Sequence, residues 1–196
     1  MKFLKILLFL LIGIVVLCLL FLLVGLVNPS VSYGHEVSVD KPIEEAWALT
    51  MDVSKYDQWL EGFKSLELIE GERNVVGSKY KVIVDPGNGQ PDFEMIETLT
   101  SMKEMEHVEL DFASEMMDFK QIMSFSEKDG KTTVKTDSKV IGSNIVMRSM
   151  FSIMEMLTGS FTKQETKNME ALKVLIDENK TDYFPEPIEA DTLMSQ

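Results

Sequence analysis

The sequence predicts an α+β domain in which a curved antiparallel sheet of about seven strands wraps around a long C-terminal helix, with one transmembrane helix before the domain. Three observations lead to this fold class. Residues 6–27 carry no charge, short runs of alternating apolar and polar residues fill residues 37–140, and from about Asn144 to Glu178 the apolar residues recur every three to four positions. Strict alternation is typical of half-buried strands, whereas the longer period is typical of an amphipathic helix.

The uncharged run at residues 6–27 predicts a membrane anchor. As a helix it is about 33 Å long, which is enough to span a bilayer. Lys2 and Lys5 precede the run, and no basic residue follows it until Lys41. The positive-inside rule therefore places the N-terminus in the cytoplasm and the domain on the periplasmic or extracellular side of the cytoplasmic membrane. The alternative is a cleaved signal peptide with a small-residue site at residues 30–32, but the apolar run is longer than such peptides usually carry.

The composition limits the partners of the remaining chain. The 196 residues allow one core of ordinary size and an appendage. The formal net charge of −13 predicts an acidic surface, which repels phosphate backbones, so we expect no nucleic-acid partner. The single cysteine, Cys18, lies in the apolar run, so no intramolecular disulfide can form. The oligomeric state stays open.

The chain divides into four parts. Residues 1–28 are the predicted transmembrane helix, residues 29–34 a short linker, residues 35–180 the folded domain and residues 181–196 a flexible acidic tail.

The folded domain is expected to begin with a strand and two short helices. Val37 and Val39 alternate with polar neighbours as in a strand, and Pro42 then fixes φ where a helix can begin. Tyr56 and Trp59 belong to a second short apolar cluster, which predicts the second short helix.

Six further strands are expected without an intervening helix. Apolar residues alternate with polar ones along each run, and Asp129-Gly130 is a strong signal for a two-residue hairpin. Short hairpin links imply an antiparallel sheet. The helical stripe that follows is interrupted by Gly159, which indicates a kink or a break in the C-terminal helix.

The stretch from Val37 to Gly77 carries a family resemblance. It contains Val-x-Val-x-x-Pro-x-x-x-Ala-Trp, then Asp-x-x-x-Tyr-x-x-Trp, then a turn bounded by Gly71 and Gly77. This pattern resembles the N-terminal half of a START-like, or SRPBCC, domain, a superfamily that includes the polyketide cyclase/dehydrase-type proteins. The resemblance covers roughly residues 34–180 and implies the helix-grip fold, whose order of strand, two helices, six strands and long helix agrees with the periodicity.

A curved sheet around one helix is expected to leave an internal cavity, because the helix does not fill the whole interior. Such cavities are mostly apolar with a few polar groups, and the 14 methionines suit an adaptable apolar pocket. The alternative is that the inward side chains simply fill the core. The residues predicted to point inward are Tyr80, Val82, Met95, Glu97, Leu99, Phe112, Met123, Phe125, Thr136, Ser138, Met150, Met154 and Phe161.

Glu97 is the one candidate for catalysis. It shares a strand face with Met95 and Leu99 and is therefore predicted to point inward. A carboxylate there is costly unless it is protonated or accepts hydrogen bonds, for which Thr136 and Ser138 are the candidate donors. In a START-like enzyme such a group would serve as general acid or base. The alternative places Glu97 at the rim of the sheet, in water.

The sequence indicates no metal and no cofactor. His35 and His107 lie far apart, and no His, Cys and Asp cluster has metal-ligand spacing. Nucleotide-binding loops and the nucleophile elbow of hydrolases are absent from the sequence. We therefore expect a membrane-anchored, non-catalytic domain for a hydrophobic small molecule or lipid. A cyclase/dehydrase-like enzyme and a protein-interaction or regulatory module are the alternatives.

Overall fold

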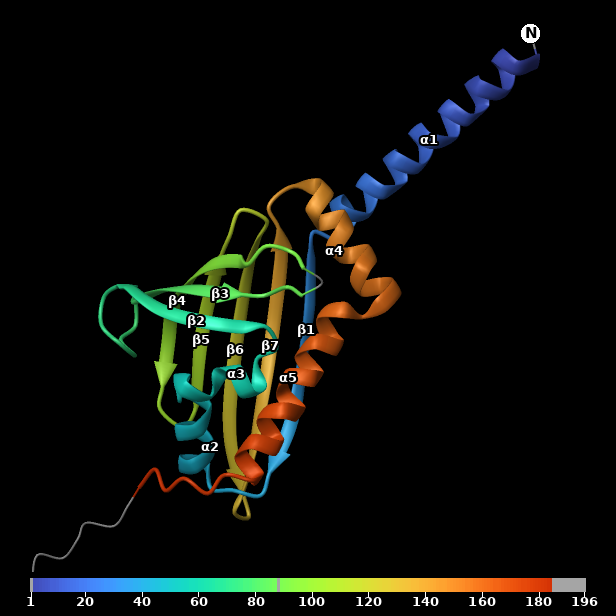
Figure 1. Cartoon of the computed structure of the whole chain (residues 1–196). Coiled ribbons are helices and arrows are strands. Elements are labelled where there is room, and N and C mark those ends of the chain that lie inside the picture. Colours follow the sequence, from blue (N-terminus) through green and yellow to red (C-terminus); the bar gives the residue numbers. More distant parts are fainter. Residues whose placement is uncertain (1, 88, 185–196) are drawn as a thin grey trace, which may run out of the picture.

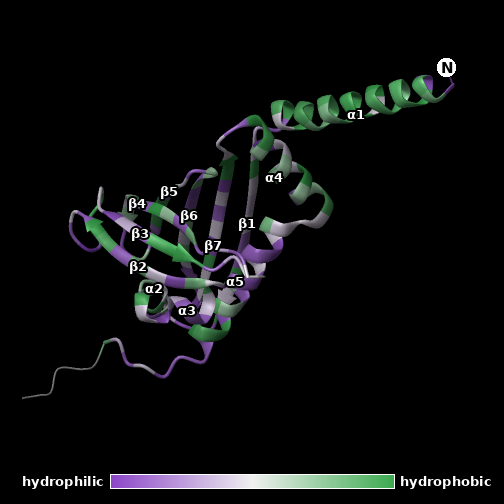
Figure 2. Ribbon diagram, turned by 45° about the horizontal axis from the view of Figure 1, so that its top comes forward, coloured by the Kyte–Doolittle hydropathy of each residue, from purple (hydrophilic) through white to green (hydrophobic). Residues whose placement is uncertain are grey.

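The computed structural model describes residues 2–87 and 89–184. Within these residues, Figure 1 shows a sheet that curves around the last helix, α5 (Ser160–Asp177), with the first helix projecting away from the domain. That helix, α1 (Lys2–Val27), is hydrophobic along most of its length in Figure 2, and its residues up to Leu20 are exposed. Among the described residues, α1 is the one helix that is long and apolar enough to cross a membrane.

The linker predicted at residues 29–34 is wrong, because strand β1 (Ser30–Val39) occupies most of it. β1 pairs with strand β7 (Lys131–Gly142) along its whole length, from Ser30 opposite Ile141 to Val39 opposite Thr132. Only residues 28 and 29 separate α1 from the sheet.

Two short helices follow β1, as the sequence predicts. Helix α2 (Ile43–Thr50) begins after Pro42, and the Ile43 backbone N–H donates to Glu127 Oε2 at 2.9 Å. A 3₁₀ turn at Val53–Lys55 leads into helix α3 (Tyr56–Trp59), with Asp52 Oδ1 accepting from the Ser54 backbone N–H at 3.0 Å. At the start of this turn the Ser54 backbone N–H has no carbonyl acceptor within the turn, and the Asp52 carboxylate accepts its hydrogen bond instead.

All seven strands of the described chain form one antiparallel sheet in the order β1-β7-β6-β5-β4-β3-β2. Every strand from β2 to β7 pairs with its neighbour in sequence, which is the expected result of short hairpin connections. The bounds are β2 Phe63–Glu70, β3 Lys79–Val84, β4 Phe93–Lys103, β5 His107–Ala113 and β6 Met117–Lys128.

The C-terminal helical region is two helices, α4 (Ile145–Thr158) and α5 (Ser160–Asp177). Gly159 between them has φ of +62°, a left-handed conformation that ends α4, and the break indicated by the sequence is therefore present. Asn144 caps the start of α4, with its Oδ1 accepting from the backbone N–H groups of Val146 and Met147 at 3.0 Å each.

The main core lies between α2, α5 and the concave face of the sheet. Met169, Leu172 and Ile176 of α5 are fully buried there. Trp47 and Phe125 belong to the same hydrophobic core. A smaller cluster near α4 contains Val31, Val140 and Phe151.

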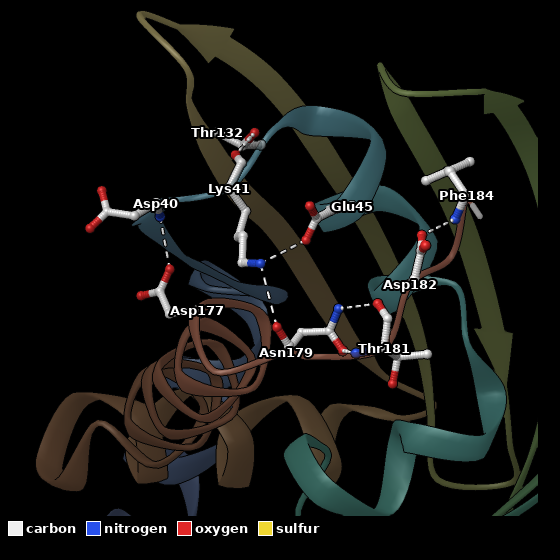
Figure 3. Close-up of polar contacts among 9 residues, drawn as sticks. All are labelled: Asp40, Lys41, Glu45, Thr132, Asp177, Asn179, Thr181, Asp182 and Phe184. Atoms are coloured by element: carbon white, nitrogen blue, oxygen red, sulfur yellow. Dashed lines mark hydrogen bonds and ion pairs between the residues drawn. The ribbon is translucent and has the colours of Figure 1, made fainter. Parts of the chain in front are cut away.

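Polar contacts close the end of the domain opposite α1 (Figure 3). Lys41 Nζ donates to Glu45 Oε2 at 2.8 Å and to the Asn179 carbonyl oxygen at 3.4 Å. The Thr132 hydroxyl donates to the Lys41 carbonyl oxygen at 2.8 Å. Lys41 thus ties the turn after β1 to α2, to the end of α5 and to β7.

The predicted tail at residues 181–196 lies largely outside the described residues. Within the described part, the Tyr183 hydroxyl donates to Asp52 Oδ2 at 2.9 Å, and the Tyr183 ring packs against the main core.

Candidate functional site

A cavity of about 260 Å³ lies between the concave face of the sheet and helices α3 and α5. Strands β1 to β6 all contribute to its wall, which is mostly apolar and aromatic. Among the described residues, no lining side chain comes from β7.

Six of the side chains predicted to point inward line this cavity: Val82, Met95, Glu97, Phe112, Met123 and Phe161. Tyr80 and Leu99 line a smaller space of about 60 Å³ next to it, and Glu97 borders both spaces. Phe125 instead fills the core, where its ring packs edge-on against Trp47 with centroids 5.0 Å apart.

Thr136 and Ser138 are buried on the inward face of β7, but they do not reach the cavity. The Thr136 hydroxyl accepts from the His35 backbone N–H at 3.2 Å, and the Ser138 hydroxyl accepts from Gln121 Nε2 at 3.3 Å. The prediction that they bond Glu97 is therefore wrong, because β7 is separated from β4 by two strands.

Met150 and Met154 of α4 do not line the cavity either. Met150 is 41% exposed, so its predicted inward orientation is wrong, and Met154 packs against the small cluster around Phe151. The prediction treated the two C-terminal helices as one stripe, and the break at Gly159 turns α4 away from the sheet interior.

The cavity is also lined by side chains outside the predicted inward-facing set. Tyr33 falls in the predicted linker, although alternation extends backward from Val37 through Tyr33 to Val31. Glu165 follows Phe161 by four residues and precedes Met169 by four, so helical periodicity would have found it. The others are Thr50, Met51, Tyr56, Trp59, Leu60, Glu61, Phe63, Leu66, Val84, Val108, Leu110, Phe119, Gln121, Gln164 and Asn168.

Aromatic rings line the part of the cavity that lies under the start of α5. Tyr33 stacks on Phe161 with centroids 5.4 Å apart and on Phe119 at 6.3 Å. Phe119 in turn stacks on Phe112 at 5.0 Å. These rings give the cavity a flat apolar surface suited to a planar or hydrocarbon group.

Glu97 presents a carboxyl group from the sheet side of the cavity. Burial raises the pKa of Glu97 from 4.5 to about 7, and no hydrogen bond within the described part of the chain opposes this effect. Burial is the main cause of the raised pKa of Tyr56. The nearby Glu97 and Tyr80 side chains raise the Tyr56 pKa further. A substantial fraction of Glu97 is therefore a neutral acid at neutral pH.

Glu165 presents a second carboxyl group from α5. Its Oε1 accepts from Gln121 Nε2 at 3.3 Å, which joins the carboxyl group to Ser138 through the same amide. Burial raises the pKa of Glu165, while a hydrogen bond from Thr136 and the nearby His35 work against this rise. The two carboxyl groups thus face a mostly apolar cavity from its two walls.

Polar side chains form the rim where the cavity approaches the surface, between the end of α3 and α5. The Glu61 backbone N–H donates to Asn168 Oδ1 at 3.2 Å, and Gln164 Nε2 donates to the same oxygen at 3.0 Å. Lys167 forms an ion pair with Glu61. These contacts hold the end of α3 against α5.

Within the described residues, no group of three or more His, Cys, Asp and Glu side chains is placed to hold a metal ion. His35 Nε2 lies 3.1 Å from Glu170 Oε1, and His107 Nε2 lies 3.0 Å from the Ser101 hydroxyl. The two histidine side chains therefore contact different partners and do not share a site.

The chain was compared with protein families, curated proteins and solved structures. No family model and no curated protein matches it. Among solved structures it is similar to Ara h 8.0201, with 12% identity and a TM-score of 0.60 over 76% of this chain and 99% of that one. A conserved protein from Geobacillus kaustophilus is 18% identical, with a TM-score of 0.60 over 74% of this chain and 95% of that one.

The di-domain ARO/CYC BexL from the BE-7585A biosynthetic pathway is also similar. It is 13% identical, with a TM-score of 0.56 over 79% of this chain and 52% of that one. The element order, the single antiparallel sheet and these likenesses together show that the chain has the helix-grip fold of the START-like, or SRPBCC, proteins.

Proposed function

We propose that the protein is a membrane-anchored binding domain that holds a hydrophobic small molecule in its internal cavity without transforming it. The observation that carries this proposal is the apolar and aromatic cavity of about 260 Å³ under α5. Its volume exceeds the ~150 Å³ that accepts benzene in an engineered core and falls just short of the ~300–1,000 Å³ of typical ligand pockets. This size favours a compact ligand, or part of a lipid, over a whole phospholipid.

The polar groups of the cavity indicate what the ligand carries besides apolar surface. Burial raises the pKa of Glu97 to about 7, so Glu97 is available as a neutral hydrogen-bond donor and acceptor, and the Glu165 carboxyl group offers acceptor oxygens from the opposite wall. A ligand with a hydroxyl or carbonyl group at each end would satisfy both. A strong acid would be disfavoured, because its charge would meet carboxyl groups in an apolar surrounding.

The membrane anchor is the second part of the proposal. α1 exposes large apolar side chains over most of its length, which is unfavourable in water and favourable in a bilayer. The Gly25 backbone N–H donates to the Ser149 hydroxyl at 3.0 Å, and the Ser152 hydroxyl donates to the Asn28 carbonyl oxygen at 2.8 Å. These contacts between α1 and α4 support an uncleaved anchor over a signal peptide, as does the fact that cleavage at residues 30–32 would cut into β1.

The position of the domain relative to the membrane follows from charge. Lys2 and Lys5 flank the start of α1, so the positive-inside rule favours a cytoplasmic N-terminus. The domain would then lie on the periplasmic or extracellular side of the cytoplasmic membrane.

The test is native mass spectrometry of the full-length protein extracted from its own membranes. We expect a reproducible extra mass that is removed by organic solvent. Val82→Phe, which places a larger side chain in the cavity wall, should abolish the extra mass. Ile69→Phe, at an exposed strand position outside the cavity, should retain it. A wild-type protein that stays free of ligand after a panel of hydrophobic compounds is offered would contradict the proposal.

A second candidate function is a cyclase/dehydrase-like enzyme. The observation that favours it is Glu97, because a carboxyl group with a pKa of about 7 in a cavity suits general acid or base catalysis. Similarity to an ARO/CYC protein points the same way. Against it, the three groups expected to act together do not converge, since Thr136 and Ser138 lie outside the cavity.

The two functions differ in what happens to a bound compound. An enzyme would release a product of altered mass, and Glu97→Gln would stop this change while the compound still binds. A binding domain would return every bound compound unchanged in both the wild type and the variant.

A further inference from the structure

Helix α4 carries an apolar face that no part of the described chain covers. Val146, Met150 and Leu157 recur at intervals of four and seven residues and therefore share one side of the helix. They are 48%, 41% and 73% exposed, and the neighbouring Met156 is 72% exposed. The only charged residues of α4 are Arg148 and Glu155. An apolar face of this kind on a surface helix is typical of a binding surface.

The same helix is fixed against the end of α1. A Cβ atom on Gly25 would lie 2.5 Å from the Ile145 carbonyl oxygen and 2.4 Å from the Ser149 hydroxyl, so the close approach of the two helices requires glycine there. The hydrogen bonds from Gly25 to Ser149 and from Ser152 to Asn28 hold the contact at two successive turns. The position of α4 is thereby set by the position of α1.

The contact determines the depth of α4 relative to a bilayer. The uncharged run of α1 ends at Val27, and the partly or fully buried residues of α1 begin at Phe21, in the part of the helix that contacts α4. At ~1.5 Å per residue, this contact extends about 9 Å back from the end of the apolar run. Helices that lie in the membrane surface bury their apolar face by a similar ~5–10 Å. In Figures 1 and 2, α4 crosses the end of α1 instead of running alongside it.

We propose that the exposed apolar face of α4, formed by Val146, Met150, Met156 and Leu157, lies in the boundary between the headgroups and acyl chains of the bilayer that α1 spans. This proposal rests on the membrane anchor proposed above. Val146 directly follows Ile145, whose carbonyl oxygen lies against Gly25 of α1, so a bilayer that surrounds α1 also meets this face of α4. The net charge of −13 opposes attraction to anionic lipid, so we expect apolar contact to be the driving force.

Met116 extends the same surface. It lies in the turn between β5 and β6 and is 41% exposed, and its carbonyl oxygen accepts from the Ser143 backbone N–H at 2.9 Å, next to the start of α4. The domain would therefore rest on the membrane through α4 and this turn, with α1 as a fixed support.

The test uses full-length protein in phosphatidylcholine vesicles and an environment-sensitive fluorophore on single cysteines. Leu157→Cys in a Cys18→Ala background reports on α4. Val76→Cys in the same background is the control, since Val76 is 55% exposed in the turn between β2 and β3. The natural Cys18 in the unaltered chain reports on α1. Nitroxide lipids with the spin label near the top of the acyl chain serve as quenchers.

We expect nitroxide lipids to quench the labels at positions 18 and 157 at least about twofold more than the label at position 76. Quenching at position 18 with none at position 157 would overturn the docking of α4 and leave the anchor in place. A label at position 157 that is shielded from water but not quenched by lipid would also overturn it, because a second protein copy would then cover the face. No quenching at position 18 would overturn the anchor itself.

Discussion

Helices α4 and α5 are separated by a single residue, yet they pack against different parts of the molecule. α5 buries Met169, Leu172 and Ile176 against the sheet and α2. α4 places Ser149 and Ser152 against α1 and leaves a broad apolar face exposed. Both helices show the same helical period in the sequence. The comparison teaches that periodicity identifies an apolar face but does not identify what covers it.

The largest expected difference between the two helices is the cost of removing a leucine from each. Leu172→Ala should lower the free energy of unfolding by about 3 kcal/mol, because the side chain is fully buried and leaves a cavity. Leu157→Ala should change it by less than about 0.5 kcal/mol, because the side chain is exposed. Urea unfolding of the full-length protein in detergent micelles, followed by near-ultraviolet circular dichroism, measures both. Equal losses would show that α4 is packed as tightly as α5.

The second expected effect concerns the cavity that α5 covers and depends on pH. The pKa of Glu97 is about 7 in the folded protein against an ordinary value of 4.5, so the folded state binds the proton more tightly. Stability should therefore fall as pH rises between these two values and stay low above them. Allowing for solvent in the cavity, Glu97→Gln should raise the free energy of unfolding by about 2 kcal/mol at pH 8 and hardly at all at pH 4.

Glu94 provides the matched control for this measurement. It lies on the opposite face of β4, is exposed and forms an ion pair with Lys81 at 3.4 Å. Glu94→Gln should leave the pH dependence of stability unchanged. The same pH dependence in the wild type and in Glu97→Gln would contradict the burial of the Glu97 carboxyl group.

A third prediction addresses the junction between the helices. Gly159 has φ of +62°, and a side chain there would meet little else, so the penalty for alanine comes from backbone strain. Gly159→Ala should cost about 1–2 kcal/mol. Gly159→Asn should cost less, because asparagine tolerates this conformation better. Thermal unfolding of both variants in micelles provides the comparison, and equal costs would contradict strain as the cause.

The smallest expected effect is at the start of α4. Asn144 caps two backbone N–H groups, so Asn144→Ala should cost about 1 kcal/mol, whereas Asn144→Asp should retain most of the cap. Hydrogen exchange should show the loss of protection confined to the first turn of α4. A loss spread over α5 as well would show that the two helices open as one unit.

The sequence predicted the fold because short-range patterns determine it. Strand alternation, the hairpin at Asp129-Gly130 and the break at Gly159 are all local signals, and the observed sheet and helices follow them. The linker at residues 29–34 was the exception. Alternation continues backward through Tyr33 and Val31, but the nearby apolar run and a glycine at position 34 obscured it.

The candidate site was less predictable because it depends on long-range contacts. The inward faces of β4 and β7 were identified correctly, so Glu97, Thr136 and Ser138 all point to the interior side of the sheet. Whether an inward side chain meets a cavity or a helix depends on where α5 crosses the sheet. Strand periodicity carries no information about that crossing, and Thr136 and Ser138 were therefore misassigned to the cavity.

Trp59 gives the protein a natural optical reporter of occupancy. Its indole ring belongs to the cavity wall, and its N–H is the buried side-chain donor that lacks a partner among the described residues. The other tryptophan, Trp47, packs against Phe125 in the core and does not line the cavity. Because indole emission responds to the polarity around the ring, a ligand that enters the cavity should shift the emission of Trp59 over a constant background from Trp47. Occupancy of the cavity can therefore be followed by fluorescence in unlabelled protein.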